Sequence, residues 1–342
     1  MTDADETHPG QPIRVPVLTP GLEAVILLAG GGRLLIPRDP EHNLAQRGVL
    51  GTHPAVIRTL AFSPDGRSLA VGGLDGSVCL WDVVTRRCCL TLPSPESWPC
   101  GLAFKPDLSA VAVAAPGLSV TSHDLVTGRV SFVSPCKHLA LNALAYAPDG
   151  GTLAEGRDNG SILLHSAIGR SKVVVSGGSP AIAVLKFAPG GRTLAAADVI
   201  DVVTLWDLEG SRQVARVQAA DSPLIDLQFT AEGRGLVVWG ASLSGPRFCD
   251  LTTGRVSDVA PGASGLYPAV ALAPDGRTLA IARGDGAIVV WELNAGRERT
   301  VLNGHRGLVW ALAFASDGQR LASGGNDMTV RLWNVPSAAV PR

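Results

Sequence analysis

The stretch GHRGLVWALAFASDGQRLASGGNDMTVRLWN, residues 304–334, contains three short apolar runs with turn signals between them. The first run ends at an S-D-G turn, the second at an N-D pair, and the third closes on Trp333. Residues 53–82 repeat this order, with a P-D-G turn, a D-G turn and Trp81 at the end. Glycine supplies the positive φ that such turns often need, and D-G is a strong hairpin signal. The pattern therefore predicts short antiparallel β-strands.

The unit recurs along the chain at nearly constant spacing. Its most regular part reads LAFSPDG (60–66), LAFKPDL (102–108), LAYAPDG (144–150), LKFAPGG (185–191), LQFTAEG (227–233), VALAPDG (270–276) and LAFASDG (312–318). The successive copies begin 42, 42, 41, 42, 43 and 42 residues apart. A T-R or T-G-R turn after the third run leads to a fourth strand, near Cys88–Leu92 in one unit. A period of about 40–45 residues is typical of four-stranded propeller blades. The sequence therefore predicts an all-β propeller with four-stranded antiparallel blades.

The number of blades is seven or eight. Residues 8–20, HPGQPIRVPVLTP, resemble HPAVIRTLAFSP at 53–64 with one residue inserted, so a degenerate eighth unit can be counted. This count slightly favours eight blades. A ring of seven would use residues 44–50 as the outer strand that closes the last blade, and would leave 13–38 as an extra hairpin. We expect a polar segment at 1–12, one propeller over 13–335 in which 13–50 is a degenerate repeat or closing segment, and a tail at 336–342.

Residues 304–334 resemble a WD repeat at nearly every diagnostic position, and the repeats cover essentially the whole chain. The lysine-poor, arginine-rich composition suggests a bacterial member of that family. The resemblance implies a buried hydrogen-bonded relay in the last blade, formed by His305, Ser323, Asp327 and Trp333. A second unit has His53, Asp75 and Trp81 at the same positions, but Val71 replaces the hydroxyl, so only a shortened relay is expected there. His123, His165 and Cys249 stand at tryptophan positions, and their blades are expected to rely on apolar packing.

The resemblance also implies a partner-binding surface, because WD-repeat proteins bind peptides and proteins where loops converge around the axis. The usual contact positions lie four and six residues before the aromatic residue of each LAF motif, and just before the relay aspartate. In this chain they map to Val56, Arg58, Leu74, Leu308, Trp310 and Asn326, and by weaker alignment to Asn142 and Asp158. A tryptophan near an arginine suits a binding hot spot.

Composition and motifs point away from most other functions. The net charge of −1 lacks the basic footprint of a nucleic-acid binder, and no apolar run reaches the length of a membrane span. The N-terminal MTDADETHPG lacks the basic and apolar parts of a secretion signal, so we expect a cytoplasmic protein. We also expect the protein to be monomeric. We expect no cofactor, because the glycine-rich stretches precede no helix pattern, and no metal, because the seven histidines are scattered.

Three hypotheses of function remain. The first is a non-catalytic scaffold for protein or peptide partners, which dense repetition without a catalytic constellation favours. The second is a sensor or regulatory part of a bacterial signalling system, although no kinase or NTPase module is encoded here. The third is a propeller enzyme, such as a lactonase or hydrolase. This is disfavoured because the recurring aspartates belong to turns and because His305, Ser323 and Asp327 fit a relay better than a catalytic triad.

Overall fold

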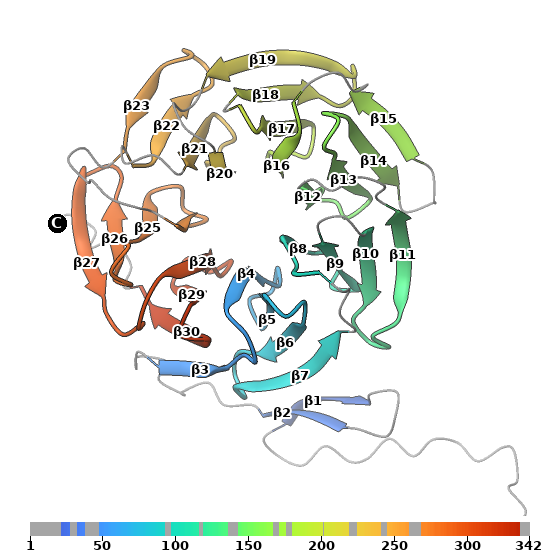
Figure 1. Ribbon diagram of the computed structural model, residues 1–342, viewed down its shortest axis with the longest axis vertical. Coiled ribbons are helices and arrows are strands. Elements are labelled where there is room, and N and C mark those ends of the chain that lie inside the picture. The colour runs from blue at the N-terminus through green and yellow to red at the C-terminus, as the bar shows by residue number, and fades with distance from the viewer. Residues whose placement is uncertain are drawn as a thin grey trace, which may run out of the picture. The chain divides into compact units, whose positions relative to one another are not determined.

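Strands alternate with tight turns along the repeats, and the computed structural model (Figure 1) arranges them as seven four-stranded antiparallel sheets. It describes residues 22–27, 33–37, 48–92, 97–115, 119–135, 143–166, 171–175, 180–200, 202–218, 224–240, 245–259 and 268–335. The chain divides into two compact units, Met1–Asn43 and Leu44–Arg342. In the first unit, β1 (Leu22–Leu27) and β2 (Arg33–Pro37) form an antiparallel hairpin.

The second unit contains the blades, each numbered by its place in the ring. Blade 1 consists of β4 (Ile57–Phe62), β5 (Ser68–Gly73), β6 (Val78–Asp82) and β7 (Arg87–Leu92). Blade 2 consists of β8 (Gly101–Phe104), β9 (Ala110–Ala115), β10 (Ser119–Asp124) and β11 (Val130–Pro135). Blade 3 consists of β12 (Ala143–Tyr146), β13 (Thr152–Gly156), β14 (Ile162–Ser166) and β15 (Ser171–Val175). Blade 4 consists of β16 (Ile182–Phe187), β17 (Thr193–Asp198), β18 (Val202–Asp207) and β19 (Arg212–Gln218).

The remaining blades follow the same order until the last strand. Blade 5 consists of β20 (Leu224–Phe229), β21 (Gly235–Gly240), β22 (Arg247–Asp250) and β23 (Val256–Asp258). Blade 6 consists of β24 (Val270–Leu272), β25 (Thr278–Ala282), β26 (Ile288–Glu292) and β27 (Arg297–Leu302). Blade 7 consists of β28 (Val309–Phe314), β29 (Arg320–Gly325), β30 (Thr329–Asn334) and, from the other end of the chain, β3 (Gly48–Thr52).

This last pairing closes the ring and corrects the slight preference for eight blades. β3 runs antiparallel to β30, with Gly48 opposite Leu332 and Thr52 opposite Thr329. The backbone N–H of His53 also donates to the carbonyl of Met328 at 2.8 Å. Because β3 supplies the fourth strand of blade 7, that blade is complete and the ring closes at seven. The resemblance of residues 8–20 to a repeat misled the count, and those residues lie outside the described part of the chain.

The repeated turns adopt the left-handed backbone that their glycines predict. Gly66 has φ of 67° and Gly318 has φ of 66°. In the LAFKPDL copy, Leu108 occupies the same position with φ of 61°, a conformation that side chains with a Cβ adopt at some cost. The turn geometry is therefore set by the repeat and not by glycine alone.

The core lies between neighbouring blades. One apolar cluster joins Ile57, Leu69 and Trp81 of blade 1 to Ala322, Val330 and Leu332 of blade 7. A second cluster joins blades 4 and 5 in the same way, through residues such as Leu205 and Leu227. Because each blade buries its faces only against its neighbours, a closed ring leaves no apolar sheet face exposed at its ends. None of the described segments forms a helix that could span a membrane.

The ring presents two different ends. The first strand of each blade lies nearest the centre (Figure 1), and the strands within each blade are antiparallel. The turn between the first and second strands is therefore at one end of the ring, and the turn between the second and third strands is at the other. We call this second end the top face; its turns include Leu74 in blade 1 and Asn326 in blade 7.

Candidate functional site

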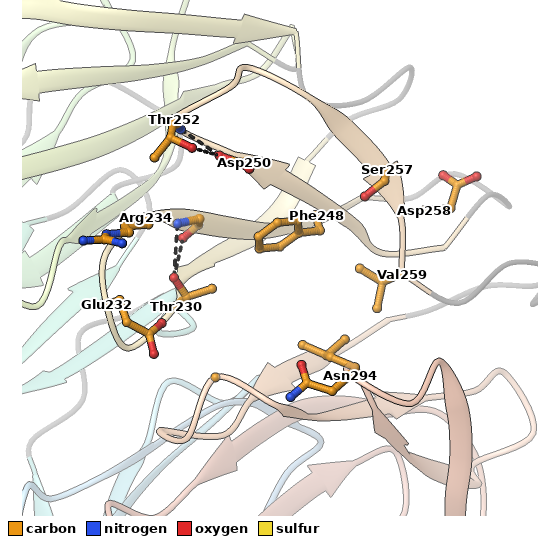
Figure 2. A pocket seen from close by; sticks show the side chains of 13 residues that line it. Thr230, Glu232, Arg234, Phe248, Asp250, Thr252, Ser257, Asp258, Val259 and Asn294 are labelled. Carbon is orange, nitrogen blue, oxygen red and sulfur yellow. Dashed lines mark hydrogen bonds between the residues drawn. The ribbon is translucent and has the colours of Figure 1, made fainter.

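A cavity of about 520 Å³ lies between blades 5 and 6, at the end opposite the top face (Figure 2). Its walls combine Phe248, Val259 and Leu293 with polar and charged side chains, Glu232 and Arg234 among them. Several of those polar groups already bond within blade 5: Thr252 donates its hydroxyl proton to Asp250 at 2.6 Å, and the hydroxyl of Thr230 accepts from the backbone of Gly235 at 3.1 Å. None of the residues predicted from the sequence lines this cavity.

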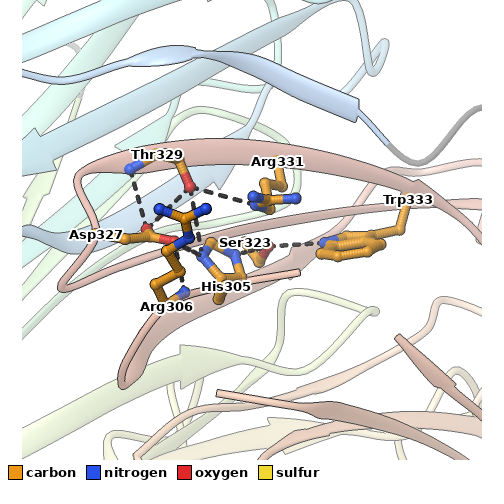
Figure 3. A network of polar contacts seen from close by, with 7 residues as sticks. All are labelled: His305, Arg306, Ser323, Asp327, Thr329, Arg331 and Trp333. Atoms are coloured by element: carbon orange, nitrogen blue, oxygen red, sulfur yellow. Dashed lines mark hydrogen bonds and ion pairs between the residues drawn. The ribbon is translucent and has the colours of Figure 1, made fainter. Parts of the chain in front are cut away.

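The relay of blade 7 is a continuous chain of hydrogen bonds (Figure 3). His305 Nδ1 lies 3.0 Å from Asp327 Oδ2, and its Nε2 lies 2.6 Å from Ser323 Oγ. Trp333 Nε1 donates to the same Ser323 oxygen at 2.7 Å. With Asp327 ionised, the imidazole donates from Nδ1 and accepts the hydroxyl proton of Ser323 at Nε2. The structure thus brings the four predicted relay residues together, with Ser323 and Trp333 fully buried.

Burial and hydrogen bonding shift the pKa values of the two titratable residues of this relay, His305 and Asp327. Burial lowers the pKa of His305, and this outweighs the hydrogen bond and charge of Asp327, which raise it. Burial alone would raise the pKa of Asp327, but donors outweigh it and hold that pKa below its ordinary value. These donors are His305 and the backbone N–H groups of Arg306, at 2.9 Å, and Thr329, at 3.1 Å. The relay is therefore built for a neutral imidazole and an ionised carboxylate.

Blade 1 has a broken version of the same arrangement. His53 Nε2 lies 3.3 Å from the hydroxyl of Ser77, which in turn donates to Asp75 at 2.7 Å. The indole N–H of Trp81 is buried without a hydrogen-bond partner, because Val71 stands where blade 7 has Ser323. Among the described residues, His53 and Asp75 are thus linked through Ser77, and Trp81 stays outside the network.

Blade 3 contains a polar network that the sequence interpretation missed. His165 Nε2 lies 2.8 Å from Oε2 of the fully buried Glu155, and its Nδ1 lies 2.9 Å from Ser171 Oγ. Arg157 Nε donates to Glu155 Oε1 at 2.9 Å. Glu155 stands at the relay serine position, and His165 stands at the tryptophan position. An acid and an imidazole at these two positions are the sequence feature from which the network could have been predicted. This blade therefore contains a part-buried ion pair, between Arg157 and Glu155, in addition to its apolar packing.

The strongest surface constellation lies where blades 7 and 1 meet around the axis. Arg58 is the second residue of β4, the innermost strand of blade 1. Trp310 is the second residue of β28, the innermost strand of blade 7. The guanidinium carbon of Arg58 lies 4.2 Å from the ring centre of Trp310 and 6.0 Å from that of Trp98. Trp310 Nε1 donates to Asn326 Oδ1 at 2.6 Å. Trp98 was not predicted, because it stands outside the repeated motif.

The other predicted face residues of blades 1 and 7 are held by equivalent backbone hydrogen bonds. The backbone N–H of Leu74 donates to the carbonyl of Val56, and that of Asn326 donates to Leu308, both at 2.9 Å. The same contact thus brings the predicted pairs together in blades 1 and 7. Leu74 is 47% exposed and Asn326 is also exposed. Asp158 lies in the corresponding turn of blade 3, and Asn142 lies outside the described residues.

The arrangement of this face favours binding over chemistry. An arginine that contacts one indole and lies near a second, with an amide that fixes the first, is typical of an interaction hot spot. Within the described segments, no group of three histidine, cysteine or acidic side chains is placed to hold a metal ion.

The ring of seven four-stranded blades and the His–Ser–Asp–Trp relay define a repeat-built β-propeller. A family model described as WD domain, G-beta repeat matches residues 45–82 and 296–334, which include the first three strands of blade 1 and of blade 7. The chain is a WD-repeat β-propeller protein. No curated protein matches it. Propellers of this family are generally scaffolds for protein interactions and are typically non-catalytic.

Proposed function

We propose that this protein is a non-catalytic scaffold that holds a protein or peptide partner on its top face, centred on blades 7 and 1. The observation that carries the proposal is the Arg58–Trp310 stack with Trp98 beside it and Asn326 fixing Trp310. Rigid aromatic and arginine side chains at the centre of a patch typically provide most of the binding free energy.

The surroundings of the stack support a binding surface of useful size. Exposed apolar side chains stand in the top-face turns of the two blades that form the stack: Leu74 in blade 1 and Met328 in blade 7. Each of these turns is held by backbone hydrogen bonds, for example Leu74 to Val56. A preorganised surface loses little conformational freedom on binding, which favours affinity.

Selection of peptides by the protein itself tests this proposal. The immobilised propeller is used to select binders from a displayed library of random 12-residue peptides, and the dissociation constants of the selected peptides are measured. Leu74→Glu and Trp310→Ala should each weaken binding about tenfold or more, as loss of a hot-spot contact does. Val126→Glu, a change in a 57% exposed turn residue at the opposite end, should leave binding unchanged.

Thermal unfolding of each variant separates lost contacts from lost fold. Selected peptides that bind Leu74→Glu and Trp310→Ala as tightly as the wild type, with both variants folded, would contradict the proposed face.

A further inference from the structure

Arg58 forms no ion pair within the described residues, although it is part-buried. Three other part-buried arginines do pair with carboxylates: Arg157 with Glu155 at 2.9 Å, Arg247 with Asp258 at 3.4 Å, and Arg320 with Asp317 at 2.6 Å. Within the described residues, Arg58 makes only its two contacts with the indole rings of Trp310 and Trp98. Its guanidinium is therefore a cation without a counter-charge from the described residues, near the start of an innermost strand on the top face.

This isolation has a free-energy cost that a ligand would recover. Arg58 is half-buried, and burial lowers the pKa of its guanidinium. Removing a cation from water is unfavourable unless it gains a partner of opposite charge or hydrogen-bond acceptors. The indole faces supply part of that stabilisation through the ring quadrupole, but they accept none of the five N–H groups.

The geometry favours a planar acceptor. Trp310 is held by its bond to Asn326, so the indole that Arg58 stacks against is fixed in place. A guanidinium held over an aromatic face keeps the N–H groups in its own plane for a bidentate acceptor, and a carboxylate matches that fork. Phosphate groups are usually recognised by clusters of arginines, whereas a single guanidinium stands against these two indoles.

We propose that the top face binds a carboxylate of its partner, and that the guanidinium of Arg58 is the group that binds this carboxylate. The carboxylate is either an aspartate or glutamate side chain or the free C-terminus of a chain. Apolar residues beside it would contact Trp98 and Trp310. This inference rests on the proposed function, since it names the chemistry of the partner at the same site.

Paired peptides test the inference directly. Peptides selected by the wild-type propeller are resynthesised with each Asp or Glu changed to Asn or Gln, with the C-terminus either free or amidated, and with phosphoserine in place of the acid. Neutralising one particular carboxylate should weaken binding about tenfold, the scale of a charge-assisted pair, and the arm that shows the loss identifies the source.

Variants of Arg58 assign the effect to this residue. In Arg58→Gln the acid and amide forms should bind within about twofold of each other, and Arg58→Lys should restore part of the preference. The control is Arg283→Gln, because Arg283 lies in a top-face turn of blade 6 but is already paired with Glu298 at 3.1 Å. In that variant the preference for the acid form should stay as in the wild type.

Two failures are distinguishable. If selected peptides depend on Leu74 and Trp310 but bind equally as acids and amides, or prefer phosphoserine, the carboxylate inference is wrong and the binding face stands. If no selected peptide depends on those residues, the proposed function itself fails.

Discussion

At the scale of single residues, the blades differ in how they satisfy one indole N–H. Trp333 donates to Ser323, and Trp206 of blade 4 donates to Thr204 at 3.0 Å. The indole N–H groups of Trp81 and Trp291 are buried without an acceptor, where the serine position holds Val71 or Ile281. A buried donor without a partner costs free energy, so these two blades gain less from the same side chain.

This contrast predicts unequal effects of one substitution. Trp333→Phe removes a hydrogen bond, whereas Trp81→Phe removes an unsatisfied N–H of similar burial, 1% against 8% exposed. Trp333→Phe should therefore lower the free energy of unfolding by about 1–2 kcal/mol more than Trp81→Phe. Chemical denaturation of both variants measures the difference, and equal losses would show that the relay bond is not stabilising.

The relay also predicts how stability depends on pH. Burial lowers the pKa of His305, and it does the same for His53 and His123. The unfolded chain therefore takes up these protons first, near the ordinary histidine pKa of about 6.5, while the folded protein keeps the rings neutral. The stabilisation is complete above that pH and is lost as pH falls through it, so the free energy of unfolding should decrease from pH 7 to pH 5.

Denaturation at pH 7, 6 and 5 tests this dependence, and His305→Gln should flatten the slope. A free energy of unfolding that stays level or rises on acidification would argue that these histidines are not held neutral.

Sequence alone predicted the relay of blade 7 because all four of its residue types were in place. It could not predict that Ser77 would link His53 to Asp75, since this depends on side-chain positions in one turn. The hydrogen bond between Glu155 and His165 was not predicted, because each residue was compared separately with the repeat. Only the two residues together indicate a polar network. Trp98 reaches Arg58 from a connecting loop, which a periodic pattern does not describe.

At the scale of strands, the closing strand β3 decides the number of blades. Residues 44–50 were one predicted candidate for this strand. Counting repeats could not decide between that pairing and a ring with an eighth blade. The pairing depends on Gly51, since a Cβ there would overlap the ring of Trp81 in blade 1. The closing strand thus contacts blade 1 as well as completing blade 7.

Substitution at Gly51 tests this closure. Gly51→Val should destabilise the propeller by about 1–3 kcal/mol, as overpacking of a core does, although valine favours strands in general. Val49→Thr, an exposed change in the same strand, should stay within about 0.5 kcal/mol of the wild type. If chemical denaturation found both variants equally stable, β3 would not be packed against Trp81 in this way.

At the scale of the whole molecule, a rigid ring places side chains from separate repeats side by side. Arg58 and Trp310 are about 250 residues apart in the sequence, yet they stack because blades 1 and 7 are neighbours in a closed ring. The stack, and with it the central part of the proposed face, exists only if the ring closes between these two blades. The fold therefore brings these residues together, and closure by β3 is a condition for the proposed binding face.

The most direct test of the proposed binding face is hydrogen–deuterium exchange of the propeller with and without a selected peptide. We expect slower amide exchange on binding at residues 53–58 and 306–310 and in the neighbouring top-face turns. Exchange at residues 124–130, at the opposite end, should not change. Protection confined to that opposite end, to the outer strands or to the cavity between blades 5 and 6 would contradict a partner held at Arg58 and Trp310.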